Sequence, residues 1–231
     1  MDDFKLSQTS TEKTNLSQGG PHFDPQLMKQ HQAADASETD VNSGYFLKRP
    51  FDLLLSSMAL VILSPVFLLI ASMIKLTSPG PVFFRQERLG VNEEPFLILK
   101  FRSMRSGSEK TGSQFTRSND SRITPVGKLI RKTSLDELPQ LINIFRGEMS
   151  LIGPRPYVGF ELKDASPAIR ARRSSVRPGI SGLAQVSGRS ALSQATVIEF
   201  DLNYVEQCSL WFDLKIVCRT LQKVIACDGS N

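Results

Sequence analysis

The amino-acid sequence predicts an α+β protein, mainly α, that inserts into a membrane from one side only, as a monotopic membrane protein. Three features predict this fold class. A long uncharged apolar segment is broken near its middle by a Ser-Pro pair, two short strands with a glycine-containing turn follow it, and the rest of the chain carries mostly helical, amphipathic patterns. With 231 residues, the chain has room for one folded domain and additional segments.

The first 44 residues differ in composition from the rest. They are rich in Ser, Thr, Gln, Asn, Asp and Gly, so they cannot bury enough surface to offset the entropy of ordering, and we expect a disordered polar tail over residues 1–44. This tail has seven acidic and three basic residues, a net charge of −4 within a total of +5, so the remainder carries +9. A basic body indicates an anionic partner: nucleic acid, phospholipid headgroups or a phosphorylated substrate.

The apolar segment runs from Leu53 to Ile74 without a charged side chain. As one helix it would extend about 33 Å, close to the roughly 30 Å of a bilayer's hydrocarbon core. Ser64-Pro65 interrupts it, because proline removes a helical hydrogen bond while the serine hydroxyl can satisfy a freed carbonyl. Basic residues on both sides favour both ends on the cytoplasmic face: Lys48, Arg49, Lys75, Arg85 and Arg88. We expect a re-entrant helix-break-helix within residues 45–78, with a kinked spanning helix as the alternative.

Residues 79–231 are expected to form a cytoplasmic domain. Strand patterns over 81–86 and 95–102 flank a turn at 90–92 and predict a small β-hairpin, followed by a polar loop over 105–121 and then mostly amphipathic surface helices. The C-terminal pattern over 209–226 predicts an amphipathic helix whose Trp211 suits a membrane headgroup boundary. Packing of the apolar stripe against the domain core explains this pattern equally well.

Histidine and cysteine usage restricts the possible chemistry. Both histidines, His22 and His31, lie in the polar tail, so acid–base or nucleophilic work in the body falls to carboxylates, Lys, Tyr, Ser or Cys. The three cysteines, Cys208, Cys218 and Cys227, have neither paired nor zinc-binding spacing, which favours plain thiols in a reducing compartment.

The segment from Arg131 to Gln140 carries the densest chemistry. Pro139 lacks an N–H and must lie in or before a first helical turn, so a helix is expected to start near Asp136, with Asp136 and Glu137 where free N–H groups and the helix dipole point outward. A plain helix cap is the simpler interpretation, with Ser134 and Glu137 as a capping box.

The surroundings of this acidic pair favour a functional site. Arg131 lies just upstream, and the turn Gly153–Pro156 presents Arg155 between two prolines, which suits bidentate hydrogen bonding to phosphate. A glycine-rich loop between Arg177 and Arg189 offers accessible backbone N–H groups, although it matches neither a Walker loop nor a dinucleotide fingerprint. A carboxylate pair among arginines, beside a membrane, would bind phosphates with a divalent ion, and one carboxylate could attack phosphorus.

Several segments, in order, resemble one family. Ser134–Leu141, continued by Gly147–Pro156, is similar to the bacterial sugar transferases, the small monotopic phosphoglycosyl transferases that start exopolysaccharide and glycan assembly. The apolar segment with its Ser-Pro pair, Lys100–Met104 and the Arg177–Arg189 loop extend the resemblance over about residues 45–226. Ser103 stands where many members have threonine, and the large multi-spanning N-terminal region of some relatives has no counterpart here.

The resemblance implies a function and a set of site residues. It implies transfer of hexose 1-phosphate from a UDP-sugar to undecaprenyl phosphate, with release of UMP, at the cytoplasmic face of the bacterial inner membrane. Asp136 would be the nucleophile that forms a phosphosugar-enzyme intermediate, Glu137 would help hold Mg²⁺, and the segment would turn back at Ser64-Pro65. The implied phosphate, nucleotide or supporting contacts are Lys100, Arg102, Arg131, Arg155, Arg177, Gln185 and Arg189.

Two other functional classes were weighed against this enzyme. A non-enzymatic membrane anchor explains the apolar segment and the basic body but not the Asp-Glu pair among arginines. A nucleic-acid-binding protein is permitted by charge, yet the chain has no helix-turn-helix, zinc or RNA-binding signature, so we expect no nucleic-acid partner. The sequence does not distinguish glucose, galactose or an N-acetylated sugar as the donor.

Overall fold

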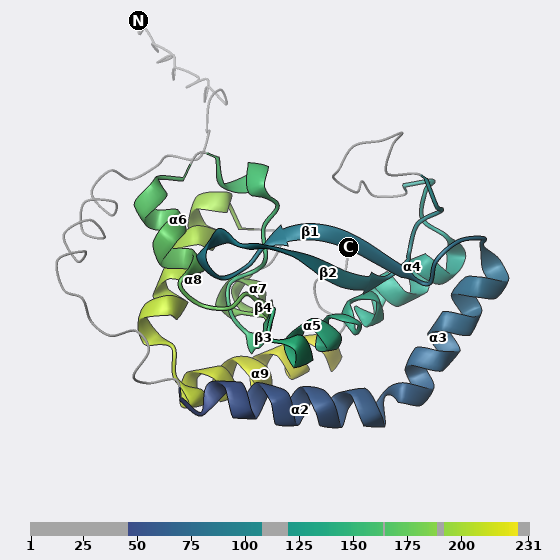
Figure 1. Cartoon of the computed structure of the whole chain (residues 1–231), viewed down its shortest axis with the longest axis horizontal. Coiled ribbons are helices and arrows are strands. Elements are labelled where there is room, and N and C mark those ends of the chain that lie inside the picture. The colour runs from purple at the N-terminus through teal and green to yellow at the C-terminus, as the bar shows by residue number, and fades with distance from the viewer. Residues whose placement is uncertain (1–45, 108–119, 164, 189–191, 226–231) are drawn as a thin grey trace, which may run out of the picture.

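The computed structural model describes residues 46–107, 120–163, 165–188 and 192–225 (Figure 1). The expected disordered tail and most of the expected 105–121 loop lie outside these residues. The elements, in chain order, are α2 (Lys48–Ile62), α3 (Ser64–Thr77), β1 (Phe83–Leu89), η2 (Val91–Glu93), β2 (Pro95–Phe101), α4 (Pro125–Lys132), η4 (Leu135–Glu137), α5 (Gln140–Arg146), β3 (Ser150–Ile152), η5 (Gly159–Leu162), α6 (Pro167–Ser174), β4 (Gly179–Ser181), α7 (Leu183–Ser187), α8 (Gln194–Gln207) and α9 (Leu210–Ile225).

The apolar segment folds as two helices, α2 and α3, bent by 60° at a break of one residue. Pro65 lies in the first turn of α3, where its missing N–H costs no hydrogen bond, and the Ser64 hydroxyl donates to the Val61 carbonyl at 2.8 Å. The break predicted at Ser64-Pro65 is therefore confirmed, together with its physical cause. Among the described residues, no single helix has the length and apolarity to cross a bilayer, but this bent pair passes that test together.

The outer and inner faces of α2 are reversed relative to those of a helix on a water-soluble protein. Asp52 and Ser56 are buried against the domain, whereas Leu54, Met58 and Val61 are exposed. Asp52 accepts a hydrogen bond from the backbone N–H of Leu151 in β3. The polar residues of α2 thus face the domain, and part of its apolar surface is exposed.

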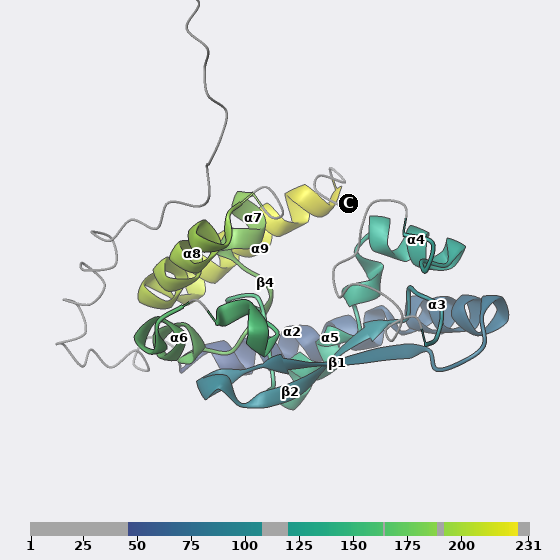
Figure 2. The same cartoon turned by 90° about the horizontal axis from the view of Figure 1, so that it is seen from above.

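The predicted β-hairpin is confirmed. β1 and β2 are antiparallel, with Phe83 opposite Phe101 and Leu89 opposite Pro95. The connection is the 3-10 turn η2, in which Asn92 takes the left-handed conformation that asparagine tolerates. Figures 1 and 2 show the hairpin running along the molecule from the α3–α4 end to α6, where Glu93 of the turn pairs with Arg170 at 3.4 Å.

The remaining elements pack around the hairpin and a two-stranded parallel sheet of β3 and β4. α5 packs on β2 and α2 through Ile98, Leu141 and Ile144, and α4 covers Phe101 with α3. α6 and α8 pack on each other around Leu202, at the end of the molecule away from α3.

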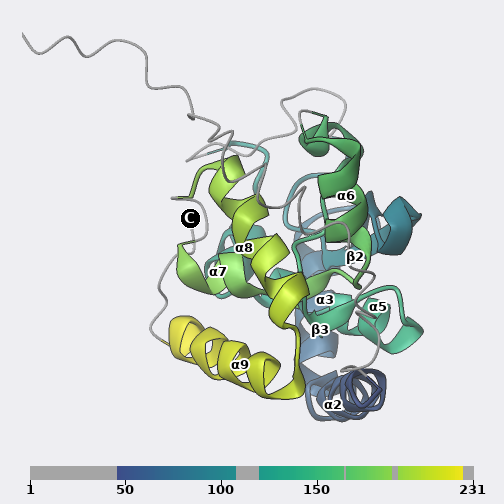
Figure 3. The same ribbon diagram turned by 90° about the vertical axis from the view of Figure 1, so that its left-hand side faces the viewer.

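The predicted C-terminal helix is confirmed as α9, and a membrane boundary at Trp211 stays a prediction. Ile216 is fully buried against β3, α7 and α8, so core packing accounts for part of the apolar stripe. Trp211 and Leu221 remain exposed. Figure 3 shows α9 at the same edge of the molecule as α2.

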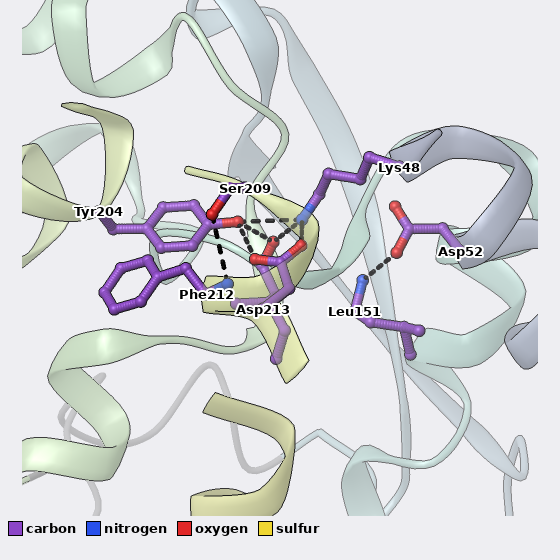
Figure 4. A network of polar contacts seen from close by, with 8 residues as sticks. Lys48, Asp52, Leu151, Tyr204, Ser209, Phe212 and Asp213 are labelled. Carbon is purple, nitrogen blue, oxygen red and sulfur yellow. Dashed lines mark hydrogen bonds and ion pairs between the residues drawn. The ribbon is translucent and has the colours of Figure 1, made fainter. Parts of the chain in front are cut away.

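A buried polar cluster joins α2 to α9 (Figure 4). The Lys48 ammonium donates to Asp213 at 2.6 Å, to the Tyr204 hydroxyl at 2.9 Å and to the Ile152 carbonyl at 2.8 Å. Tyr204 in turn donates to the Asp213 carboxylate at 2.8 Å. Because Lys48 is the first residue of α2, this cluster fixes the start of α2 to β3, α8 and α9.

Candidate active site

The acidic pair lies in a tight turn between α4 and α5. Ser134, two residues after the end of α4, has a left-handed conformation (φ 55°), which is strained for a non-glycine residue. The 3-10 turn η4 directly after it carries Asp136 and Glu137. Pro139 directly precedes α5 as its N-cap residue, where its missing N–H costs no hydrogen bond. The α-helix therefore starts at Gln140 and not near Asp136 as predicted, because Leu135–Glu137 form a separate 3-10 turn. The Ser134 side chain makes no capping hydrogen bond, so the capping-box interpretation is wrong: a residue in the left-handed region cannot serve as an ordinary N-cap.

Lys100 of β2 faces this turn. Its ammonium lies 2.7 Å from the Glu137 carboxylate, and both side chains are partly exposed. Both are residues that the sequence resemblance implies for the site, and the structure brings them together. Adjacent carboxylates with a cation across them form an arrangement suited to phosphate and a divalent ion.

Asn143 of α5 holds β2 in place beside the turn, a role that was not predicted from the sequence. Its side chain is fully buried, accepts from the Leu99 N–H at 3.0 Å and donates to the Leu97 carbonyl at 2.8 Å. These are backbone groups on the edge of β2 that faces away from β1, so one amide replaces a neighbouring strand. Lys100 is thereby fixed relative to the turn that α5 continues.

Asp136 is partly buried, and burial raises its pKa to about 6, with the neighbouring Glu137 charge as the next cause. Lys100 and Arg131 oppose this shift by favouring the carboxylate. The group is therefore ionised at neutral pH but poorly solvated, which is the condition of a reactive carboxylate rather than of a surface one. Arg131, at the end of α4, thus lies within electrostatic reach of Asp136, as predicted.

Arg155 lies on the turn Gly153–Pro156 and its side chain is exposed. Arg88 of β1 lies close by: its guanidinium donates to the Pro156 carbonyl at 3.1 Å, and the charges of both Arg155 and Glu137 affect its pKa, which burial lowers. Arg88 thus lies within electrostatic range of both Glu137 and Arg155, whereas contact of Arg155 with the acidic pair stays a prediction.

Arg88 was counted in the sequence only as a membrane-flanking charge. The register of the hairpin shows that Arg88 lies on the same strand face as Lys100, which the sequence pattern alone did not indicate. Arg88 lies opposite Phe96 and Lys100 opposite Phe84, so by the alternation of strand residues Arg88 and Lys100 extend from the same face.

Arg102 is used inside the fold. Its side chain is buried and donates to the Ser78 hydroxyl at 2.7 Å and to the Ser78 and Pro79 carbonyls at 2.8 and 2.9 Å. These contacts fix the connection between α3 and β1. The structure does not bring Arg102 to the acidic pair, and a phosphate contact by it stays a prediction.

The remaining predicted contacts lie elsewhere. Arg177 donates to the Gly147 carbonyl at 2.9 Å, at the opposite end of α5 from the acidic pair. Gln185 of α7 has a buried side-chain oxygen without a hydrogen-bond partner among the described residues, next to Gly182. Arg189 lies outside the described residues.

A divalent ion would find a limited set of protein ligands here. In the part of the chain that the structure describes, no group of three or more His, Cys, Asp or Glu residues is placed to hold a metal. Mg²⁺, however, usually keeps several waters and binds one or two carboxylates together with substrate phosphates. Asp136 and Glu137 fit that mode, which needs the substrate to complete it.

Comparison with known protein families identifies one match over most of the chain. The model of the bacterial sugar transferase family matches residues 43–227. The chain is similar to "Exopolysaccharide production protein ExoY" of Sinorhizobium fredii (strain NBRC 101917 / NGR234), at 43% identity over 202 residues, which are 81% of this chain and 89% of that protein.

Two further relatives are longer proteins. The chain is 45% identical over 191 residues to the "UDP-N-acetylgalactosamine-undecaprenyl-phosphate N-acetylgalactosaminephosphotransferase" of Aeromonas hydrophila, covering 80% of this chain and 45% of that protein. It is 43% identical over 185 residues to the "UDP-glucose:undecaprenyl-phosphate glucose-1-phosphate transferase" of Escherichia coli (strain K12), covering 77% of this chain and 40% of that protein. The chain thus spans less than half the length of these two relatives.

Proposed function

Because the chain belongs to the bacterial sugar transferase family and is a phosphoglycosyl transferase, we propose that it transfers hexose 1-phosphate from a UDP-sugar to undecaprenyl phosphate in exopolysaccharide production. The relatives named for this reaction use UDP-glucose or UDP-N-acetylgalactosamine as donors. The donor of this chain is therefore a UDP-hexose, and its identity is the first quantity to measure.

The observation that carries the mechanism is the state of Asp136. A partly buried carboxylate with a pKa of about 6, next to Lys100 and Arg131, has lost hydration and faces cations that can hold phosphate oxygens. An Asp136 oxygen attacks the sugar-bearing phosphorus, and the phosphoanhydride bond to UMP breaks. The bonding electrons leave with UMP, and the sugar phosphate stays on Asp136 as a mixed anhydride.

The second half of the reaction reverses the first with a different partner. A phosphate oxygen of undecaprenyl phosphate attacks the same phosphorus, the bond to Asp136 breaks, and the carboxylate is restored. The water-soluble donor and the lipid acceptor thus use one site in succession, in a ping-pong order. UMP leaves before the lipid phosphate enters.

Lys100, Arg131 and Arg155 supply the charges that bind the donor's phosphates. Arg155 is exposed on a held turn and can form bidentate hydrogen bonds with a phosphate. Glu137 would help hold Mg²⁺, which would supply positive charge to the donor's phosphates. To hold the ion, the Glu137 carboxylate would have to give up its contact with Lys100, and the Lys100 ammonium would then be available to a phosphate oxygen.

The bent helix pair and the reversed polarity of α2 support membrane attachment. Leu54, Met58 and Val61 on α2 and Leu68 and Leu69 on α3 are exposed, as a lipid-embedded surface requires. We propose that α2 and α3 enter and leave the cytoplasmic face of the bacterial inner membrane as a re-entrant segment. Residues 79–231 then act as the catalytic domain on that face, where the phosphate of a membrane lipid is within reach of Asp136.

A trapping experiment tests the proposal. Purified chain in detergent micelles is mixed with Mg²⁺ and a panel of UDP-sugars carrying a labelled hexose, without acceptor. The matched donor should release about one UMP per chain in a burst and leave its label on the protein. Addition of undecaprenyl phosphate should then move the label into the lipid fraction.

The control is Asp136→Asn, which keeps the size and shape of the side chain but removes the attacking oxygen charge. It should give neither burst nor bound label while still partitioning with membranes. If it releases UMP normally, the nucleophile is another group. If the wild-type chain turns over no UDP-sugar with undecaprenyl phosphate, the proposed reaction itself is wrong.

A further inference from the structure

The turn that carries Arg155 is held at four successive carbonyls. The backbone N–H of Gly179 donates to Pro154 and that of Leu89 donates to Tyr157, both at 2.9 Å. Between them, the Arg173 guanidinium donates to the Arg155 carbonyl at 2.5 Å and that of Arg88 donates to the Pro156 carbonyl at 3.1 Å. The donors come from β4, β1 and α6, so three separate elements fix one short segment.

The guanidiniums of Arg88 and Arg173 also make contacts with side chains outside the turn that carries Arg155. Arg173 pairs with the fully buried Asp201 of α8 at 2.8 Å and lies over the Tyr157 ring, 4.2 Å from its centroid. Arg88 pairs with Glu161 at 3.4 Å, and the same Glu161 oxygen accepts from the Val158 N–H at 2.8 Å. A buried arginine with both a carboxylate and a carbonyl partner has little freedom to move.

These contacts separate the roles of the arginines. The Arg173 side chain is only 6% exposed and that of Arg88 12%, whereas Arg155 is exposed. A phosphate could reach Arg155 without breaking a contact. At Arg88 Nη1 and Arg173 Nη2 it would have to displace carbonyl and carboxylate partners, and the Arg88 Nε, which has no hydrogen-bond partner in the described part of the chain, is buried. Resting on the proposed phosphate contact of Arg155, we propose that Arg88 and Arg173 are positioning residues, which act on donor binding by holding the backbone of Arg155.

Positioning matters here because Arg155 is useful only where its planar guanidinium meets the phosphate oxygens of a donor whose phosphorus also faces Asp136. A displacement of about 1 Å in such a group can lower a rate on the order of a hundredfold. Lysine at position 173 or 88 keeps the positive charge beside the carboxylate but cannot form the same forked pair of contacts, so the turn loses a tether while the charge balance is kept.

The test is a pair of double-mutant cycles on steady-state UMP release, using the UDP-sugar that turns over fastest in the donor panel. Arg173→Lys and Arg88→Lys should each lower kcat/KM for the donor by about tenfold or more, mainly through KM, in the chain that carries Arg155. In the Arg155→Ala background, the same substitutions should change kcat/KM by no more than about twofold, because the group they position is gone.

The matched control is Arg172→Lys, next to Arg173 on α6, which pairs with Glu206 at the surface and should leave kcat/KM unchanged in both backgrounds. Thermal unfolding of each variant shows whether it is folded, and the Arg88 cycle stands alone if Arg173→Lys does not fold. Equal losses with and without Arg155 would overturn the inference while leaving the proposed function intact. Normal turnover by Arg155→Ala alone would instead remove the proposed phosphate contact, and the inference with it.

Discussion

Replacing Asp136 by asparagine should stabilise the fold at neutral pH in the same variant that loses transfer. The carboxylate is ionised at pH 8 in a site that burial and Glu137 make unfavourable for charge, and this is why its pKa is raised from 3.8 to about 6. An amide of the same shape removes that charge. The charged carboxylate is thus expected to lower the stability of the fold, and its removal should raise that stability.

The magnitude follows from the pKa shift. Ionising a group whose pKa is about two units higher in the folded chain costs the fold about 3 kcal/mol at pH 8, at about 1.4 kcal/mol per unit. Because Asp136 is only partly buried, this is an upper bound, and a gain of about 1–2 kcal/mol, or roughly 2–8 °C in Tm, is the working expectation.

The sign fixes the pH window. The folded chain holds the Asp136 proton more tightly than the unfolded chain, so wild-type stability falls as the pH rises from about 4 to about 6. The advantage of Asp136→Asn should therefore be absent below pH 4, about half developed at pH 5 and complete above pH 7. The carboxylate is also the attacking form, so the wild-type rate of labelling by donor should fall below about pH 6.

The assay is thermal unfolding of both chains in one detergent at pH 5 and pH 8. Asp120→Asn is the matched control, because hydrogen bonds from Arg122 lower the pKa of Asp120 to about 2, the opposite direction. Its substitution should lower Tm at pH 8 or leave it unchanged. A lower Tm for Asp136→Asn than for wild type at pH 8, or an equal gain at both pH values, would show that Asp136 is not a desolvated carboxylate.

Three further predictions concern other contacts. Glu137→Gln should raise the Mg²⁺ concentration needed for half-maximal UMP release by at least about tenfold, because loss of a group that only supports a metal ligand already lowers metal affinity by about that factor. An unchanged Mg²⁺ titration would contradict the role of Glu137. Lys48→Met leaves Asp213 buried without its cation and should lower the free energy of unfolding by about 3–5 kcal/mol. The double variant Lys48→Met with Asp213→Leu should recover most of this loss in the same unfolding experiment. Equal stability of the single and double variants would argue against the pair. Pro65→Ala removes the obstacle to one continuous helix that spans the membrane. In an otherwise cysteine-free chain, a cysteine placed in the tail should then react with a thiol reagent added outside intact spheroplasts, and should not react in the parent. A tail cysteine that reacts in the parent would refute the re-entrant topology.

The main local elements were predictable because their causes are local. Proline at position 65 breaks a helix wherever it folds, and the period-two pattern around Gly90 specifies a hairpin before any partner is present. Pro139 likewise indicated a helix start close by, and α5 does begin directly after it, although Asp136 and Glu137 lie in the preceding 3-10 turn. The capping-box interpretation failed because Ser134 adopts a left-handed conformation, which the composition of the segment does not reveal.

The role of each charged side chain was decided by contacts between distant segments. Arg102 and Arg155 look alike in sequence, yet Arg102 is buried among the carbonyls of Ser78 and Pro79 while Arg155 is exposed on a turn. Asn143 gave no signal at all, because an amide matters only once it reaches the free edge of β2.

The sequence by itself determined the break in the apolar segment, the hairpin and the position of the acidic turn, because backbone sterics and hydrophobic periodicity act within a few residues. Only the tertiary structure decided the raised pKa of Asp136, the pairing of Lys100 with Glu137 and the clamping of the Arg155 turn. Desolvation and ion pairing depend on which groups from distant parts of the chain come within a few ångströms of one another. The spacing of residues along the chain does not show which of them become neighbours in the fold.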